Sequence, residues 1–382
     1  MSGINSLTPK LPSSLGEWLR KPDEPDRVYT KNKKIEVVFL VEAVNAILPR
    51  TEGVEDITLI KLPGTEYEVP VILPEKLQAV ARRRMLANLR RFRDKAPERL
   101  KEHLKSLAAI YKVKVKNKEQ VIGFIKAKEA LENNKEWNCY IQPPGGDIKK
   151  ATDIGMDGFC PACALFGTTI TNNVLEIYDP GSKKNVFGES VGVKSRIEFD
   201  PAFAFLDQEK SVAEYTHNKV SDGVSWTGQS LYEEKHVVPG TVFIGKVTLE
   251  DVTETELKAF LATLASIDRL GGRERIFGGV RIHLLGIKGG SHETVSALEL
   301  SKELARKLGD REYPPDVNEI EELVKPILQS KGFEKITSDD FRKLLNDMNL
   351  WDNLWKDIVE YDRQIVLRIL GLIKSEENIK KA

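Results

Sequence analysis

The pattern of apolar and polar residues predicts strands and helices in an interleaved order, followed by a helical end. The run Ile35–Val41 is β-branched and aromatic, which indicates a buried strand. From Pro74 to about Lys95 the apolar residues recur at helical spacing, which predicts an amphipathic helix. Residues 291–382 are expected to be helical, with Ser338 as an N-cap of one helix.

A strand–helix–strand unit is marked most clearly in the second half of the chain. Its strand covers Thr241–Leu249, and its helix opens with the capping box Thr253-x-x-Glu256. A glycine-rich turn leads from this helix into a second strand, Val280–Ile287. Segments 174–206 and 229–250 are also typical of strands. With no repeat at solenoid spacing, the order predicts an α+β protein.

These elements divide the chain into four parts. Residues 1–26, rich in proline and without a sustained period, predict a loose arm. The core is expected in residues 27–73 and 174–290, interrupted by a basic insertion over 74–173. Residues 291–382 then form a helical region.

Charge changes this picture, because a net charge of zero hides an uneven distribution. Residues 76–118 contain fifteen Lys or Arg against three acids, whereas residues 291–382 contain fifteen against nineteen. A basic stretch in a neutral chain indicates a face that binds a polyanion. The 30% of charged residues also suits the surface ion pairs of a thermophile. No membrane span or signal peptide is evident, so we expect a soluble cytoplasmic protein.

All three cysteines fall within 25 residues, at Cys139, Cys160 and Cys163. The Cys-x-x-Cys spacing lets two thiolates reach one tetrahedral ion, so we expect structural zinc. The fourth ligand stays open among a histidine, Asp157 and water, with His103 the nearest histidine upstream. Two alternatives remain: three ordinary buried cysteines, or a redox pair. A redox pair would be expected to open a helix after a strand.

Two further segments are candidates for binding phosphate. In the glycine-rich segment 270–279, glycines allow close approach of the backbone to a ligand, and arginines grip phosphates. It matches neither a Walker loop nor a dinucleotide fingerprint, and the alternative is a loop that merely ends a helix. The helix from Pro74 carries a run of arginines, for which the alternative is solvated surface charge. The five histidines are scattered and no catalytic motif is present, so we expect no enzyme activity.

Together these features resemble the RAMP superfamily of CRISPR-associated proteins. The segment Cys160–Gly167 is similar to the Cys-Pro-x-Cys-x-Leu-Phe-Gly segment of its larger backbone subunits. Residues 35–53 resemble their first strand and loop, and residues 238–279 resemble the final half of their core. The type I-D backbone subunit, with its zinc-containing insertion, is the most similar type.

The resemblance implies a modified RRM or ferredoxin-like core, a zinc-containing insertion, and a β-hairpin thumb around residues 207–228. It implies binding of CRISPR RNA without strong sequence preference. Partners would be further copies of the chain, other CRISPR complex subunits, and a target that pairs with the guide. The residues expected to contact RNA are Arg50, Arg82, Arg83, Arg84, Arg90, Arg196, Lys219, Trp226, Gly271, Gly272, Arg273, Arg275 and Gly278.

Two other functions remain open. Type III backbone subunits cut target RNA with an aspartate in the loop after the first strand. Residues 42–53 contain Glu42 and Glu52 but no aspartate, which puts such cleavage in doubt. The other alternative is a metal-clipped structural adaptor that binds no nucleic acid, and the basic stretch argues against it.

Overall fold

The computed structural model is a mixed α/β structure whose strands pair antiparallel throughout the described residues. The residues that it describes are 9–50, 57–115, 118–132, 137–139, 157–178, 185–218, 231–271, 277–311 and 314–369. The strands are β1 (Lys34–Ala43), β2 (Leu59–Lys61), β3 (Glu68–Ile72), β4 (Tyr111–Val115), β5 (Lys118–Phe124), β6 (Thr168–Tyr178), β7 (Asn185–Val193), β8 (Ile197–Phe199), β9 (Ala202–Phe203), β10 (Val212–Asn218), β11 (Leu231–Val237), β12 (Val242–Glu250), β13 (Val280–Gly290) and β14 (Glu334–Lys335).

Helices surround these strands, and several are short. They are η1 (Ser13–Trp18), α1 (Pro74–Lys95), α2 (Pro97–Ala108), α3 (Ile125–Glu132), α4 (Pro161–Phe166), α5 (Gln208–Ser211), α6 (Glu254–Ala265), α7 (Ala297–Leu308), α8 (Val317–Ser330), α9 (Ser338–Arg342), η3 (Lys343–Asn346) and α10 (Met348–Ile369).

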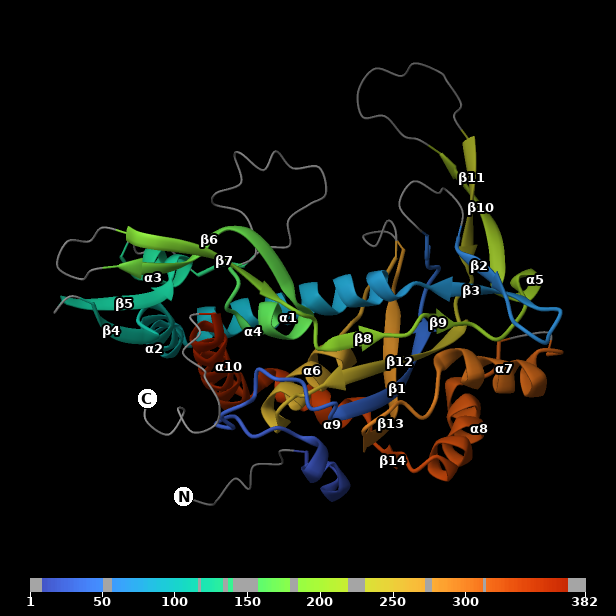
Figure 1. Ribbon diagram of the computed structural model, residues 1–382. Helices are drawn as coiled ribbons and strands as arrows, with labels where there is room; N and C mark the ends of the chain where they lie inside the picture. Colours follow the sequence, from blue (N-terminus) through green and yellow to red (C-terminus); the bar gives the residue numbers. More distant parts are fainter. Residues whose placement is uncertain are drawn as a thin grey trace, which may run out of the picture.

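The main sheet has the order β14-β13-β1-β12-β9-β3-β2, with β8 also paired to β12 (Figure 1). Strand β1 lies between β12 and β13, which helix α6 joins. The predicted strand Ile35–Val41 is confirmed within β1, and its apolar side chains are fully buried. A strand buried on both faces is a continuous apolar run, and this explains why the sequence marked it so clearly.

Helices cover both faces of the sheet. On one face, Phe260 of α6 lies 6.2 Å from Phe199 of β8, which lies 6.3 Å from Phe39 of β1. On the other face, the Ser301 hydroxyl of α7 donates to the main-chain oxygen of Ala204 at 2.8 Å. Figure 1 shows α1 along the first side and α7 and α8 on the second. The sheet is therefore the central layer of the protein.

The linker between β13 and α7 is fixed onto the second face by buried charges. Lys246 of β12 is 1% exposed and forms ion pairs with Glu293 of the linker and with Asp200, the latter at 3.5 Å. Glu36 of β1 accepts hydrogen bonds from the main-chain N–H of Thr294 at 2.9 and 3.0 Å. Paired in this way, the charges of the sheet face hold the linker in place.

The predicted helix from Pro74 to Lys95 and the capping box of α6 are both confirmed. Ser338 was expected as an N-cap, which is wrong by one residue, since Thr337 takes that position. The reason is a tertiary contact: the Ser338 hydroxyl donates to the main-chain oxygen of Ile282 of β13 at 2.8 Å.

Two segments extend from the main sheet in different directions (Figure 1). The first is a second sheet, ordered β4-β5-β6-β7, which reaches Val193 and so passes the expected insertion boundary at residue 173. The second is the hairpin of β10 and β11, where we expected a thumb around 207–228. Strand β10 lies within that range, whereas its partner β11 lies beyond it.

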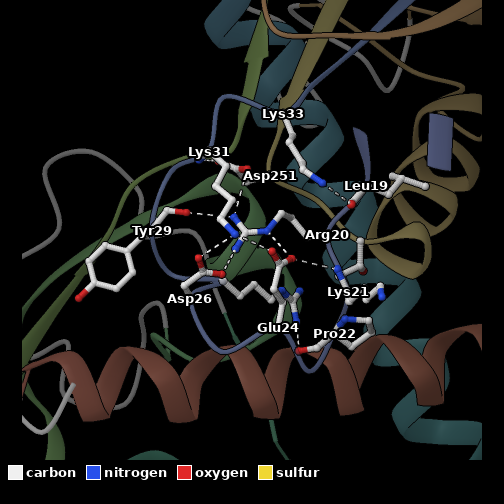
Figure 2. Close-up of polar contacts among 12 residues, drawn as sticks. Leu19, Arg20, Lys21, Pro22, Glu24, Asp26, Tyr29, Lys31, Lys33 and Asp251 are labelled. Carbon is white, nitrogen blue, oxygen red and sulfur yellow. Dashed lines mark hydrogen bonds and ion pairs between the residues drawn. The ribbon is translucent and has the colours of Figure 1, made fainter. Parts of the chain in front are cut away.

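The N-terminal residues 9–26, for which we expected a loose arm, pack against the core in the structure. The guanidinium of Arg20 is fully buried and forms ion pairs with Glu24 at 2.7 Å, Asp26 at 3.0 Å and Asp251 at 3.2 Å (Figure 2). Lys31 also pairs with Glu24, at 2.8 Å. The contact of Arg20 with Asp251 cannot be recognised from the local sequence, because the two residues are more than 200 positions apart.

We expect Glu24→Gln to destabilise the fold by about 1–3 kcal/mol near neutral pH, because charge-assisted hydrogen bonds are lost. Although burial alone would raise it, hydrogen bonds from Lys31 and Arg20 lower the pKa of Glu24 from 4.5 to about 2. A lowered pKa contributes stability that is complete above the unfolded value and disappears as pH falls through the folded value. The difference from wild type should therefore shrink between about pH 4.5 and pH 2.

Urea unfolding at pH 7 and at pH 3 measures this difference. Glu17→Gln, at an exposed position of the same arm, is the control and should change little. Equal unfolding of the Glu24 variant and wild type at pH 7 would contradict the role assigned to Glu24.

Candidate nucleic-acid interface and metal centre

The three cysteines and Asp157 form one buried cluster. The ligand atoms of Cys139, Asp157, Cys160 and Cys163 all lie within 4.8 Å of one another, and all four residues are buried. The sulfurs of Cys139 and Cys163 are 3.7 Å apart. Three thiols and a carboxylate at this spacing suit one tetrahedral metal ion. The cluster can therefore hold a metal ion.

Local structure explains how the Cys-x-x-Cys segment converges. Cys160 is the N-cap of α4 and Pro161 its first residue, so Cys163 lies one turn into the helix. The segment does open a helix, as a redox pair would be expected to do, because α4 begins directly after Cys160. What distinguishes the site from a redox pair is the third thiol, Cys139, together with complete burial of all three.

Asp157 is the fourth candidate ligand and also organises the loop. One carboxylate oxygen accepts from the main-chain N–H groups of Phe159 at 3.1 Å and Cys160 at 3.0 Å. The other accepts from the indole N–H of Trp137 at 2.7 Å. His103, the nearest upstream histidine, instead contacts Asp352 at 2.8 Å. Among the described residues, Asp157 is therefore the fourth member of the cluster that could bind a metal ion.

The pKa shifts within the cluster follow from burial and from hydrogen bonds between its members. Hydrogen bonds from the thiols of Cys160 and Cys163 lower the pKa of Cys139 to about 6. Burial raises the pKa of Cys163 to about 11, that of Asp157 to about 7, and that of Cys160 well above its usual 9.0. Several negative charges in this buried cluster are unfavourable without a cation, and a bound divalent ion would offset them.

Three arginines of α1 point at this cluster. Arg82 donates to the main-chain oxygen of Gly167 at 2.8 Å and to the sulfur of Cys163 at 3.6 Å. Arg90 donates to the main-chain oxygen of Cys139 at 2.7 Å, and Arg93 to that of Trp137 at 3.0 Å. Arg82 and Arg90, both predicted to contact RNA, thus hold the cysteine loop.

The neighbouring arginines lie on another side of the same helix. Arg83 is exposed, and Arg84 contacts the Ser266 hydroxyl at 3.0 Å and Asp268 at 3.7 Å. Both line an open groove of about 470 Å³ between α1 and the segment after α6, and Arg269 lies on its far wall. The groove gathers guanidinium groups beside the glycine-rich segment.

The loop after β1 and the ends of the glycine-rich segment are joined. The main-chain N–H of Gly278 donates to Ala46 at 2.8 Å, and that of Gly279 donates to the Asn45 side chain at 2.5 Å. Gly271 has a φ of +105°, and a Cβ there would lie 2.9 Å from the Leu48 oxygen. Only glycine fits such a position without displacing the backbone. Gly272, Arg273 and Arg275 lie outside the described residues.

The base of the hairpin meets the same loop. Ile47 and Val237 of β11 exchange main-chain hydrogen bonds at 3.1 and 2.9 Å, and Arg50 pairs with Glu234 at 3.5 Å. The ring of His236 lies 4.5 Å from that of Phe277. Three segments distant in sequence thus converge at one end of the sheet. Lys219 and Trp226 lie outside the described residues.

Arg196, also predicted to contact RNA, is placed inside the protein instead. It is 7% exposed, forms an ion pair with Glu256 at 2.7 Å and lies over the ring of Tyr361. Asn45 and Phe277, which the sequence analysis did not single out, lie at the converging segments. Neither carries a periodic or spacing signal that could have found it.

Comparisons with known proteins place the chain in a family. The family model described as Csc2 CRISPR matches residues 19–354. The crystal structure of Thermofilum pendens Csc2 is similar at 34% identity and a TM-score of 0.67, over 95% of this chain and 97% of that one. A CRISPR RNA-guided surveillance complex in a pre-nicking state matches 79% of this chain and 90% of its own, with 10% identity and a TM-score of 0.41. A comparison with curated proteins found no match.

The family match covers most of the described fold and the whole cysteine loop, and it defines a CRISPR-associated protein. The chain belongs to the Csc2 family. The predicted resemblance to the type I-D backbone subunit is thereby confirmed at the level of the family. None of the helices in the described residues is both long and apolar enough to cross a bilayer.

Proposed function

We propose that this protein is a non-catalytic backbone subunit of a type I-D-like CRISPR surveillance complex in the cytoplasm, bound along the guide RNA. Copies of the chain would stack head to tail, because an interface between two different surfaces generates an open filament. Other subunits would join them, and the target would pair with the guide. The charged fraction of 30% fits a thermophilic host.

The observation that carries the proposal is the convergence of three segments beside a groove rich in arginine. The loop holding Arg50, the segment from Gly271 and the projecting hairpin meet at one end of the sheet. The groove of Arg83, Arg84 and Arg269 begins at the same segment. Main-chain amides and guanidinium groups bind phosphates irrespective of base, which suits a guide of any sequence.

A modified RRM core is part of the proposal. The order β13-β1-β12, continued by β8 and β9, together with the connection through α6, supports it. Helices α1 and α6 would be the two helices of that core, so the insertion would begin after α1 and not at residue 74, where the sequence analysis had placed its start. The face that RRM domains offer to RNA would then be the one covered by α7 and the linker at Glu293.

Structural zinc is the metal that we propose for the cysteine cluster. Cys139, Cys160 and Cys163 would bind it as thiolates, with Asp157 as the fourth ligand. The ion would stabilise the insertion by linking residue 139 to the start of α4. It supplies structure there and no chemistry.

The proposal predicts that the double charge reversal Arg83→Glu and Arg84→Glu weakens binding of generic single-stranded RNA by roughly tenfold or more. The loss should be similar for every sequence, because phosphates are contacted. The salt dependence should flatten by roughly 0.7 in logarithmic slope for each lost phosphate contact. Fluorescence anisotropy of the full chain over a salt series measures both.

The matched control reverses Arg306 and Lys307, two adjacent basic residues of α7 on the opposite side of the sheet. That variant should bind RNA like wild type. An RNA affinity and slope unchanged in the α1 variant would contradict the proposal and favour the structural adaptor. Shortening of the bound RNA by the wild-type protein would favour the cleaving alternative.

A further inference from the structure

Arg82 stands apart from the arginines around it because it contacts a sulfur atom. Its guanidinium reaches the Cys163 sulfur at 3.6 Å and the main-chain oxygen of Gly167 at 2.8 Å. Arg90 and Arg93 also reach the cysteine loop, but through main-chain and amide oxygens. The guanidinium of Arg82 therefore lies directly against one of the candidate metal ligands.

The contact between Arg82 and Cys163 would offset negative charge in the metal-bound cluster. A divalent ion held by three thiolates and one carboxylate carries a net charge of about −2 in a buried site, which burial penalises. A guanidinium that donates to one thiolate offsets part of this charge. Because the planar fork is also held by Gly167, the donor is already directed at the sulfur before the ion binds.

The position of Arg82 on α1 separates it from the groove. The groove is lined by Val80, Arg83, Arg84 and Ala87 of α1, and Arg82 is not among its residues. Successive residues of a helix are about 100° apart, so consecutive arginines face different surroundings. One helix thus directs Arg82 to the metal cluster and Arg83 to the groove.

We propose that Arg82 is an outer-sphere partner of the metal centre, which stabilises the Cys163 thiolate and tightens metal binding, rather than a nucleic-acid contact. The inference rests on the metal of the proposed function and not on RNA binding. It assigns the basic run of α1 to two tasks: Arg82 positions a metal ligand, and Arg83 lines the groove.

The test is zinc affinity of the full chain, measured by competition with a chromophoric chelator. Arg82→Met should lower the affinity 10- to 100-fold, the range for lost outer-sphere partners. Arg82→Lys, which keeps the charge without the fork, should lie between. Arg83→Met, one residue along, should bind zinc like wild type. Equal zinc affinity of Arg82→Met and wild type would overturn the proposal.

Cobalt(II) in place of zinc separates a contact to sulfur from a general role in folding. A hydrogen bond to a thiolate lowers the energy of the sulfur lone pairs, so its loss should move the sulfur-to-cobalt charge-transfer band to longer wavelength. Arg90→Met removes a hydrogen bond to a main-chain oxygen of the same loop, not to a sulfur, and should therefore leave the band at the same wavelength. Identical bands in Arg82→Met and wild type would make Arg82 merely structural. If Arg82→Met does not fold, Arg82→Lys and Arg82→Gln take its place in both measurements.

Measurements of RNA binding separate the role of Arg82 from that of Arg83. Metal-loaded Arg82→Met should bind RNA with wild-type affinity, whereas Arg83→Met should bind RNA more weakly. If the metal-loaded Arg82 variant loses RNA affinity as Arg83→Met does, its exclusion from the nucleic-acid interface is wrong. If no variant and no wild-type protein binds RNA, the proposed function fails, while the cobalt shift still decides the role of Arg82.

Discussion

Cys160→Ser is expected to abolish stoichiometric metal binding and to lower the melting temperature by roughly 5–10 °C. In the proposed site Cys160 would supply one of three thiolates and it is also the N-cap of α4, so its loss would break the link between residue 139 and that helix. A serine hydroxyl does not replace a thiolate as a zinc ligand. Elemental analysis of wild type should give about one zinc per chain, and differential scanning fluorimetry gives the melting temperatures.

The control for this variant is Ala162→Ser, which adds a hydroxyl between the two ligands without removing either. Ala162 is fully buried, so this variant should melt slightly lower but keep its metal. Wild-type protein that contains no metal after purification without chelators would show that the cluster is three ordinary buried thiols.

A second large effect is expected from Glu256→Gln, at about 3–5 kcal/mol of unfolding free energy. Glu256 is fully buried and forms ion pairs with Arg27 at 2.6 Å and Arg196 at 2.7 Å. The neutral amide would leave two guanidinium charges of the interior without their carboxylate. Breaking a buried pair costs more than forming it contributes, because the remaining charge stays desolvated.

The same carboxylate predicts a dependence on pH. Burial alone would raise its pKa, but the charges of Arg196 and Arg27 lower the pKa of Glu256 to about 2. Its contribution is complete above the ordinary value of 4.5 and is lost as pH falls towards 2, so the variant and wild type should converge there. Glu254→Gln is the control for urea unfolding, since its carboxylate is 60% exposed and pairs with Lys258 on the surface. A loss for Glu256→Gln no larger than this control would rule out the buried network as a major source of stability.

The best-predicted elements carry their signals locally. The bounds of α1 follow from Pro74 and an apolar stripe, and those of α6 from the capping box at Thr253. The hairpin that contains strand β10 was expected from the family resemblance and not from an alternation of apolar and polar residues, because its buried face includes the polar side chains of Glu234 and His236. The packing of residues 9–26 was missed for another reason: a buried arginine is recognised only once its distant carboxylates are known.

The residues of the candidate site also include some with a local sequence signal and others whose positions depend on tertiary packing. Spacing alone located Cys160 and Cys163, because metal ligands keep short separations, but it left the fourth ligand open among a histidine, Asp157 and water. The sequence revealed the run of arginines but not the direction in which each side chain points. Which arginine faces the sulfur depends on how α1 packs against the cysteine loop, and the composition of the run does not determine this packing. Arg196 shows the extreme case, since the ion pair with Glu256 draws it into the core.

The linker pinned by Lys246 across the second face of the sheet bears on how a guide could be chosen. A sheet face open to RNA presents rows of side chains that discriminate one base from another. Here that face is covered by α7 and the linker at Glu293 and Thr294, whereas the converging segments at one end of the sheet offer amides and guanidinium groups. Under the proposed function, a pool of guides with unrelated spacers should therefore load with equal efficiency, and base pairing by the guide, not contacts of the protein, would decide which target is recognised.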